Sequence, residues 1–282
     1  MKTKTFVEEL ANAKRDGYAI GAFNIFNHLS ARAVIGAAQT TNRSVILQTS
    51  PQTVKRFGPL ELGAMLRQLA WSASVNVIIH LDHCQNVDMA KACIDAGWDS
   101  VMFDGSRLSF DDNIRLSREV VSYAHARGVF VEGELGRIAG VEEEVAVDES
   151  GAALAGQDES LRYVGESGVD ALAPAVGTAH GVYKGKPNIN YALIEDLKKA
   201  MDTPVMIHGG TGLGEGVFKK LIAAGASKMN VSTAIKYAYV GGCKEYFADN
   251  PDKMDPLDLD YFLSYRIGDT AAEYMKVFHG ER

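Results

Sequence analysis

The chain of 282 residues is predicted to fold as a single-domain α/β protein, a (β/α)8 TIM barrel. Short runs of β-branched and other apolar residues recur along it, and most are followed by a segment with the apolar spacing of a helix. The runs are apolar on both faces, as expected for a parallel sheet covered by helices. A single barrel domain commonly has this length. A doubly wound open sheet is the alternative, but no GxGxxG motif follows the first run.

The expected strands come at short intervals. In order, they cover residues 18–23, 44–48, 76–81, 99–103, 129–134, 170–176, 204–208 and 228–231. Helix-like segments cover residues 30–40, 60–72, 87–96, 110–126, 191–200 and 216–224, and a C-terminal helical segment covers about 257–282. Several later strands follow a glycine, the residue that commonly ends a helix, so these boundaries are marked as well.

The segment at about 135–160 interrupts this alternation, because a βα loop usually has about 2–6 residues. It is rich in acidic residues and glycine, as in the stretch GVEEE at positions 140–144. This composition favours a solvent-exposed insertion. A second interpretation is a long active-site loop that closes over the substrate, since long loops at the C-terminal face of a barrel often do so.

The charge and cysteine content exclude several classes of protein. The net charge is −7 and the pI about 5.5, whereas nucleic-acid binding usually needs a basic surface. Three cysteines without a CxxC pair fit reduced thiols and not a disulfide framework. The N-terminus carries charges where a signal peptide is apolar, and no apolar run is long enough to span a membrane. We therefore expect a cytoplasmic protein without nucleic-acid or membrane partners.

Three of the seven histidines fall at the C-terminal ends of predicted strands: His83, His180 and His208. In a barrel these ends face one another around the mouth, where the chemistry takes place. Each histidine alone is more often structural. Together, at equivalent positions, they indicate a Zn²⁺ site with an open fourth position for substrate.

The other residues of this kind have simpler interpretations. His80 lies inside a strand and is expected to pack in the barrel, whereas His125 and His279 are expected on the surface of helical segments. Cys84 is interpreted as a small buried thiol, because no base for a nucleophile is evident. Asp82 and His83 are adjacent, and adjacent strand residues point to opposite faces. Both can serve one site only if the strand gives way to a loop there.

Glycines at the ends of the later strands predict a second feature. Gly181, Gly209, Gly210 and Gly212 permit a ligand to approach the backbone closely, and Ser232-Thr233 precedes a helix-like run. The loops after strands 7 and 8, with amides of a helix N-terminus, form the usual phosphate site of a barrel. The sequence therefore predicts a phosphorylated substrate beside a metal.

Several segments then form a recognisable set: GAFNIFN (21–27), SVILQTS (44–50), LDHC (81–84), VMFDGS (101–106), EGELGRIAGVEEE (132–144), GTAHGVYKG (177–185), HGGTG (208–212) and NVSTAIK (230–236). Together they resemble the class II, zinc-dependent ketose-bisphosphate aldolases, above all the fructose- and tagatose-bisphosphate branches. The resemblance runs from about residue 5 to about residue 270.

The resemblance implies reversible cleavage of a phosphorylated ketose to dihydroxyacetone phosphate and an aldehyde. The substrate would be fructose 1,6-bisphosphate, tagatose 1,6-bisphosphate, or a related ketose 1-phosphate with a distal anion such as a 6-sulfo group. It further implies that His83, His180 and His208 bind the catalytic zinc. Asp82 would act as acid and base at the hydroxyl deprotonated during cleavage, and Glu142 would exchange the proton at the enediolate carbon.

Further positions match the family pattern. Asp104 and Glu134 match ligands of an alternative or second metal position, and some members bind a monovalent cation near the phosphate. Asn230 matches a residue that contacts the hydroxyls of dihydroxyacetone phosphate, and Asn24 and Ser50 lie in the matching N-terminal motifs. The implied phosphate cradle consists of Gly181, Lys184, Gly209, Gly210, Thr211, Ser232 and Thr233, where Thr211 replaces a common serine.

The distal end of the substrate is less constrained. Residues 50–58 match no branch of the family well, but Lys55 and Arg56 lie there at the catalytic end of the barrel. Arg266 resembles a family arginine that reaches the distal phosphate from a neighbouring subunit, so a homodimer or homotetramer is expected. We expect these cations to recognise a second anionic group.

Three alternatives use other chemistry or none. A Schiff-base aldolase needs a buried lysine, but predicted strand 6 has none and Lys228 lies at the entry of strand 8. An amidohydrolase-type site would want an HxH pair after strand 1, where this chain has Phe23-Asn24-Ile25. The third alternative is a non-catalytic barrel subunit that stabilises or regulates a partner aldolase.

Overall fold

In the computed structural model, residues 5–142, 145–147, 153–181, 183, 185 and 187–281 are described. Within them, parallel strands close into a barrel in the order β1-β11-β10-β8-β5-β4-β3-β2, which confirms the predicted (β/α)8 fold. All the predicted strands are present, with ends shifted by a few residues. The barrel strands are β1 (Ile20–Asn24), β2 (Val45–Thr49), β3 (Val77–Cys84), β4 (Ser100–Phe103), β5 (Phe130–Leu135), β8 (Ala171–Pro174), β10 (Val205–Ile207) and β11 (Ala226–Val231).

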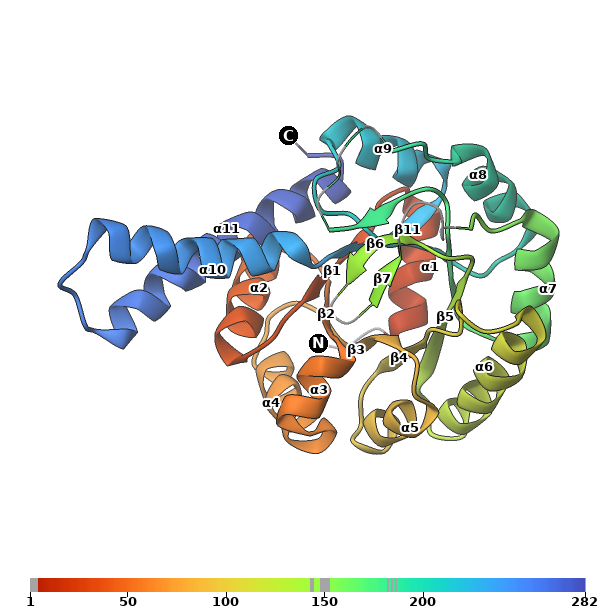
Figure 1. Cartoon of the computed structure of the whole chain (residues 1–282), viewed down its shortest axis with the longest axis horizontal. Coiled ribbons are helices and arrows are strands. Elements are labelled where there is room, and N and C mark those ends of the chain that lie inside the picture. Colours follow the sequence, from red (N-terminus) through yellow and green to blue (C-terminus); the bar gives the residue numbers. More distant parts are fainter. Residues whose placement is uncertain are drawn as a thin grey trace.

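Helices surround the barrel, as Figure 1 shows. The predicted ones are α2 (His28–Thr41), α4 (Pro59–Trp71), α5 (Val87–Asp95), α6 (Phe110–His125), α8 (Tyr191–Ala200), α9 (Glu215–Ala224) and the C-terminal α11 (Pro256–Phe278). Four more are α1 (Phe6–Asp16), α3 (Pro51–Phe57), α7 (Gln157–Ser167) and α10 (Thr233–Asp249). Helix α3 occupies residues expected as loop, because Ser50 caps it and Pro51 stands in its first turn.

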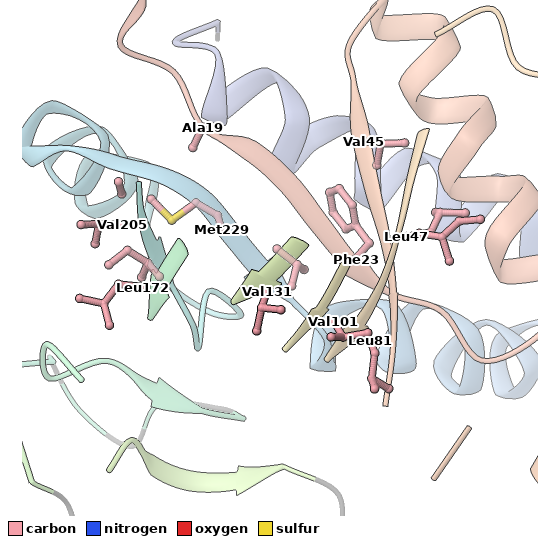
Figure 2. Packing of buried hydrophobic residues seen from close by; sticks show 14 of the residues in the cluster. Ala19, Phe23, Val45, Leu47, Leu81, Val101, Val131, Leu172, Val205 and Met229 are labelled. Atoms are coloured by element: carbon pink, nitrogen blue, oxygen red, sulfur yellow. The ribbon is translucent and has the colours of Figure 1, made fainter. Parts of the chain in front are cut away.

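Side chains alternate between the two sides of the barrel wall. Outward-facing residues such as Phe23, Leu47 and Val101 pack under the helices (Figure 2). A separate inner cluster contains Ile46, Ile78 and Met102. This alternation follows from the two-residue period of a strand, and it assigns every polar strand residue to the inside or the outside.

Helix α1 closes one end of the barrel. Phe6 and Leu10 are fully buried in the inner cluster, and Figure 1 shows α1 at the centre of the ring of helices. A capping box fixes its start, with Thr5 and Glu8 each accepting a bond from the other's backbone N–H. The helix precedes the first strand and has no counterpart in the βα alternation, so the pattern did not predict it.

The segment predicted as a long acidic loop contains regular structure. Strand β6 (Ala139–Glu142) pairs antiparallel with β7 (Val145–Val147) and parallel with β9 (Ala179–His180), and α7 begins at Gln157. The pairing between Gly140 and His180 places this small sheet against the metal-site candidate. Strand β9 supplies the hydrogen-bonding edge, a partner that the local sequence did not reveal.

Helices α10 and α11 form an arm. Figure 1 shows them extending together away from the barrel, while α11 also packs along α2. None of the helices in the described part of the chain is long and apolar enough to cross a bilayer.

Two histidines outside the mouth have defined environments. His80 is fully buried and stacks on Phe6 at 5.5 Å between ring centroids, which confirms its packing role. His279, predicted to be a surface residue, is partly buried. Its ring stacks on Tyr18 at 4.5 Å, and burial, with the charge of Arg43, lowers its pKa to about 4. The reason is that the end of α11 folds back beside the start of β1, where Ala19 N–H donates to the carbonyl of Phe278.

Candidate active site

Three imidazoles converge at the mouth of the barrel, two of them from barrel strands and one from the small sheet beside it. His83 belongs to the end of β3, His180 to β9 and His208 to the residue after β10. Their ring centroids are 4.8 Å apart for His83 and His180, 4.5 Å for His83 and His208, and 6.1 Å for His180 and His208. One ligand atom from each lies within 4.8 Å of the others, the spacing of a metal site.

The backbone at His83 explains how two adjacent residues serve one site. His83 has φ of +46°, and the register between β3 and β4 shifts between Leu81 and Cys84. This left-handed conformation is uncommon for a residue with a Cβ and costs about 1–3 kcal/mol. It turns the side chain of His83 to the same side as Asp82, so the strand gives way where the sequence required it to.

Two carboxylates flank the histidines. Asp104 Oδ2 and Glu134 Oε2 each lie 3.5 Å from His83 Nδ1, and these three residues form a second potential metal-binding group. Burial acts to raise the pKa of Asp104, but its bond to His83, the charge of that ring and bonds from Ser106 lower it overall. The pKa of Glu134 is raised by burial and by the charge of Asp104.

Two buried atoms test whether this site suits a cation. His208 Nδ1 and Glu134 Oε2 are buried 3.5 Å apart, and within the described residues neither atom has a hydrogen-bond partner. An unsatisfied buried acceptor is costly unless an ion or water compensates it. A nitrogen and oxygen donor set of this kind fits a zinc ion.

A buried acid and a buried lysine stand behind His208. Glu132 Oε1 accepts a bond from His208 Nε2 at 2.8 Å, and Oε2 accepts one from Lys228 Nζ at 2.7 Å. Both side chains are fully buried. Burial would raise the pKa of Glu132, but Lys228, His208 and His80 together hold it well below its usual range. Neither residue was among the predicted site residues, although Glu132 closes the same strand as Glu134, two positions before it.

Asp82 is held by three amides. Its Oδ2 accepts bonds from Asn24 Nδ2 at 2.8 Å and Gln48 Nε2 at 3.1 Å, and its Oδ1 accepts one from Asn230 Nδ2 at 3.1 Å. Gln48 also donates to Asn24 Oδ1 at 2.7 Å. Gln48 was missed, although a buried glutamine inside an apolar strand signals a polar partner. The network fixes the orientation of the carboxylate next to His83.

The predicted phosphate cradle is a pocket beside His180. It is lined by His180, Gly181, Gly209, Gly210, Thr211, Asn230, Ser232, Thr233 and Lys236. At Gly209, φ is +74° and a Cβ would lie 2.3 Å from the carbonyl oxygen of Ala179, so only glycine fits. The pocket opens at the first residues of the 17-residue helix α10, whose N-terminal amides favour an anion. Lys236 was not predicted to line it.

Comparison with known proteins identifies the family to which this chain belongs. Residues 4–281 match the family model Fructose-bisphosphate aldolase class-II. The chain belongs to the class II fructose-bisphosphate aldolase family. A sulfofructosephosphate aldolase from Alkalicoccus urumqiensis is 33% identical over 279 residues, which are 96% of this chain and 95% of the relative.

Solved structures agree with this class II aldolase assignment. The YdjI aldolase from Escherichia coli K12 superposes with a TM-score of 0.87 at 28% identity, covering 98% of this chain and 97% of that one. Fructose-bisphosphate aldolase from Campylobacter jejuni, at 23% identity and a TM-score of 0.80, covers 96% and 92% and supports the fold. The chain is thus a lyase that cleaves a phosphorylated ketose. The alternative of a non-catalytic subunit is set aside.

A larger cavity in this class II aldolase lies next to the cradle, and both share His180. Its lining includes Ser50, Lys55, Asp82, His83, Asp104, Arg107, Glu134, Arg137 and His180. Arg107 and Arg137 were not predicted. Arg56 is exposed on α3 and is not part of this lining, whereas Lys55 is. Arg266 lies on the arm, where its Nη2 is 3.1 Å from Glu245 Oε2.

Two predicted residues are not described by the structure. Lys184 lies outside the described residues, and so does the side chain of Glu142, whose backbone ends β6.

Cys84 behaves as an inert thiol. Burial raises its pKa to about 11, and its Sγ donates to the carbonyl of Asn86 at 3.2 Å.

Proposed function

We propose that this class II aldolase is zinc-dependent and cleaves a ketose 1-phosphate that carries a second anion at its far end. The products would be dihydroxyacetone phosphate and an anionic aldehyde. The observation that carries the proposal is the shared wall at His180, which joins a glycine-lined anion pocket to a cavity containing Asp82 and His83. A phosphate bound in the anion pocket would place the adjoining carbons of the substrate beside Asp82 and His83.

The metal would be held by His83, His180 and His208. Their spacing and the buried Nδ1 of His208 support this set. When bound, zinc supplies a Lewis acid for the carbonyl next to the bond that breaks. Asp104 and Glu134, which group with His83, would hold the ion in an alternative position or a second divalent ion.

Asp82 would act as the acid–base group. In cleavage, its carboxylate takes the proton from the hydroxyl on the carbon that becomes the aldehyde. The O–H electrons form the new C=O bond, and the electrons of the broken C–C bond stay with the dihydroxyacetone phosphate part. The amides of Asn24, Gln48 and Asn230 keep the carboxylate in one orientation, which lowers the cost of reaching the reactive geometry.

Glu142 would return a proton to the carbon released by cleavage. It lies on β6, and Gly140 on the same strand pairs with His180 at the metal-site candidate. A carboxylic acid there could exchange its proton with solvent between turnovers. This role is distinct from that of Asp82, which acts on oxygen.

The phosphate would be bound by backbone amides of Gly181, Gly209 and Gly210 and by the hydroxyls of the cradle, with Lys184 contributing from outside the described residues. The glycines admit the ligand to the backbone, and α10 presents its N-terminus. Asn230 lines the cradle and bonds Asp82, so it could also contact a substrate hydroxyl. A monovalent cation near the phosphate would fit the family.

The distal anion would be bound by cationic side chains that line the larger cavity. Lys55, Arg107 and Arg137 all line it, and Arg56 lies next to Lys55 on α3. The named activity of the relative from Alkalicoccus urumqiensis suggests a sulfonate as that anion, whereas a bisphosphate would offer a phosphate. Arginine can bind either group with two parallel hydrogen bonds.

A second subunit would supply Arg266. The arm that carries it exposes large apolar side chains, including Met254 (83%), Leu257 (76%), Tyr261 (80%) and Tyr265 (66%). An apolar patch of this kind usually marks an interface. A homodimer or homotetramer built on the arm would cover it and could bring Arg266 to a neighbouring site.

The test is a panel of phosphorylated ketoses offered to zinc-loaded and chelator-treated protein. Compounds with a distal phosphate, a distal sulfonate and no distal charge should be compared. Zinc-dependent cleavage, with the highest kcat/KM for one of the doubly charged compounds, is the expected result. Borohydride should trap no covalent adduct. Full activity in metal-free protein, or equal kcat/KM without the distal charge, would contradict the proposal.

A further inference from the structure

The fully buried pair Glu132 and Lys228 lies inside the barrel behind the metal-site candidate. The two residues come from β5 and β11, and the carboxylate lies between Lys228 and His208. Burying two charges is expensive, and an apolar pair of similar volume is often at least as stable. Stability alone therefore does not account for an ion pair at this position.

The hydrogen-bonding capacity of each group determines the arrangement. The ammonium of Lys228 can only donate, and the carboxylate of Glu132 can only accept. Lys228 donates to Oε2 at 2.7 Å, so Oε1 must accept the Nε2–H of His208 at 2.8 Å. In the neutral form of the imidazole, which is the form that binds a metal, the single ring proton then lies on Nε2. Nδ1 is left with its lone pair, and this is the atom that faces Glu134 Oε2 in the cluster.

We propose that Glu132, oriented by Lys228, is a positioning residue that fixes His208 in the tautomer that can bind a metal through Nδ1. The inference rests on the zinc site of the proposed function, and it concerns only how this chain prepares one of the ligands. Hydrogen bonds behind a ligating histidine typically change metal affinity by about 10–100-fold.

The substitution Glu132→Gln tests the direction of the bond and not only its presence. Glutamine has the same shape but offers one acceptor and one donor. The ammonium of Lys228 can donate only to the amide oxygen of the glutamine, so the NH₂ group would face His208 Nε2. The ring proton would move to Nδ1, where Glu134 Oε2 at 3.5 Å could accept it. We expect Glu132→Gln to fold and to lose about 10–100-fold in Zn²⁺ affinity.

Removing the lysine should reverse this loss. In Glu132→Gln with Lys228→Met, the amide is free to turn its oxygen to His208 Nε2–H. Its NH₂ group could then donate to His80 Nε2, which lies 3.5 Å from Glu132 Oε2 and has no hydrogen-bond partner among the described residues. Zn²⁺ affinity should return to within about threefold of the wild-type value, a difference well below the change of about 10–100-fold expected when the bond behind the ligand is lost. A residue needed only for packing would not be rescued by a second substitution.

A matched pair keeps the test decisive if Glu132→Gln does not fold. Glu132→Leu with Lys228→Met removes the same two charges as the rescued variant but cannot accept a bond from His208. We expect it to bind Zn²⁺ about 10–100-fold more weakly than Glu132→Gln with Lys228→Met. Ser100→Ala is the control, because it removes the 2.8 Å bond to His80 Nδ1, which is also buried in the barrel, and leaves the bond between Glu132 and His208 in place.

Zn²⁺ affinity should be measured on the full chain by competition with a chelating dye, and the visible spectrum of the Co²⁺-loaded protein should be recorded beside it. Wild type and Ser100→Ala should agree in both measurements. The inference is overturned if Glu132→Gln binds as tightly as wild type, or if the leucine and glutamine double variants bind equally. If wild type and His208→Ala bind Zn²⁺ equally weakly, the zinc site itself is wrong, and the proposed function fails with it.

Discussion

Asp82→Asn separates proton transfer from structure at this site. The new amide has the shape of the carboxylate but cannot take a proton from a substrate hydroxyl. Removing a general base typically lowers the rate by about 10²–10⁴-fold. At about 1.4 kcal/mol for each factor of ten, the barrier rises by roughly 3–5 kcal/mol. We expect kcat to fall by about 10²–10⁴-fold while the three histidines still bind zinc.

The stability cost follows from the three bonds to Asp82. The amide oxygen would take the place of Oδ2 and accept from Asn24 and Gln48. The NH₂ group would then face Asn230, whose Oδ1 is buried and has no hydrogen-bond partner among the described residues. A half-turn of the Asn230 amide presents this oxygen and preserves the third bond. The half-turn moves Asn230 Nδ2 to the place of Oδ1, so the number of buried polar groups without a partner does not rise. The cost should therefore be about 1 kcal/mol or less, which is about 2–4 °C in Tm.

The assay combines single-turnover cleavage, zinc content and thermal unfolding. Gln48→Met is the comparison, since it removes one donor and leaves the carboxylate in place, and its kcat should fall less than that of Asp82→Asn. Cleavage by Asp82→Asn at close to the wild-type rate would refute the assignment of the base. If well-folded Asp82→Asn lost its zinc, the conclusion that Asp82 is not a metal ligand would be refuted.

Three further outcomes are expected. Glu142→Ala should slow the exchange of the dihydroxyacetone phosphate proton with solvent, followed by NMR in deuterated buffer, while cleavage of the ketose is less affected; equal exchange rates would refute the role. Gly209→Ala should raise the KM for the phosphorylated substrate or prevent folding, because the new Cβ would lie 2.3 Å from the Ala179 carbonyl oxygen. Burial holds the pKa of His279 at about 4, below the usual 6.5; the folded state therefore binds fewer protons than the unfolded state between these values, and stability should fall as the pH drops from 6.5 to about 4. His279→Phe should flatten this dependence in a series of Tm measurements, and an unchanged slope would count against it.

The barrel and the ends of its strands could be predicted from the amino-acid pattern alone. Apolar runs with glycine-marked boundaries placed His83, His180 and His208 at strand ends, and parallel strands bring such ends to one mouth. The glycines that admit a phosphate were equally evident from the sequence, and φ of +74° at Gly209 shows why that position needs glycine. These features depend on local periodicity and backbone conformation, which neighbouring residues decide.

The contacts between side chains inside the barrel could not be predicted in this way and are known from the folded chain. The alternation of a strand shows that Glu132 faces inward, but not that Lys228 from β11 reaches it at 2.7 Å. The same holds for Gln48, which meets Asp82 across β2 and β3. Each contact depends on strand order and on the stagger with which the barrel closes, and both are set by packing of the whole chain. The turn at His83 belongs to this group, since its unfavourable φ is sustained by the surrounding strands and not by its own sequence.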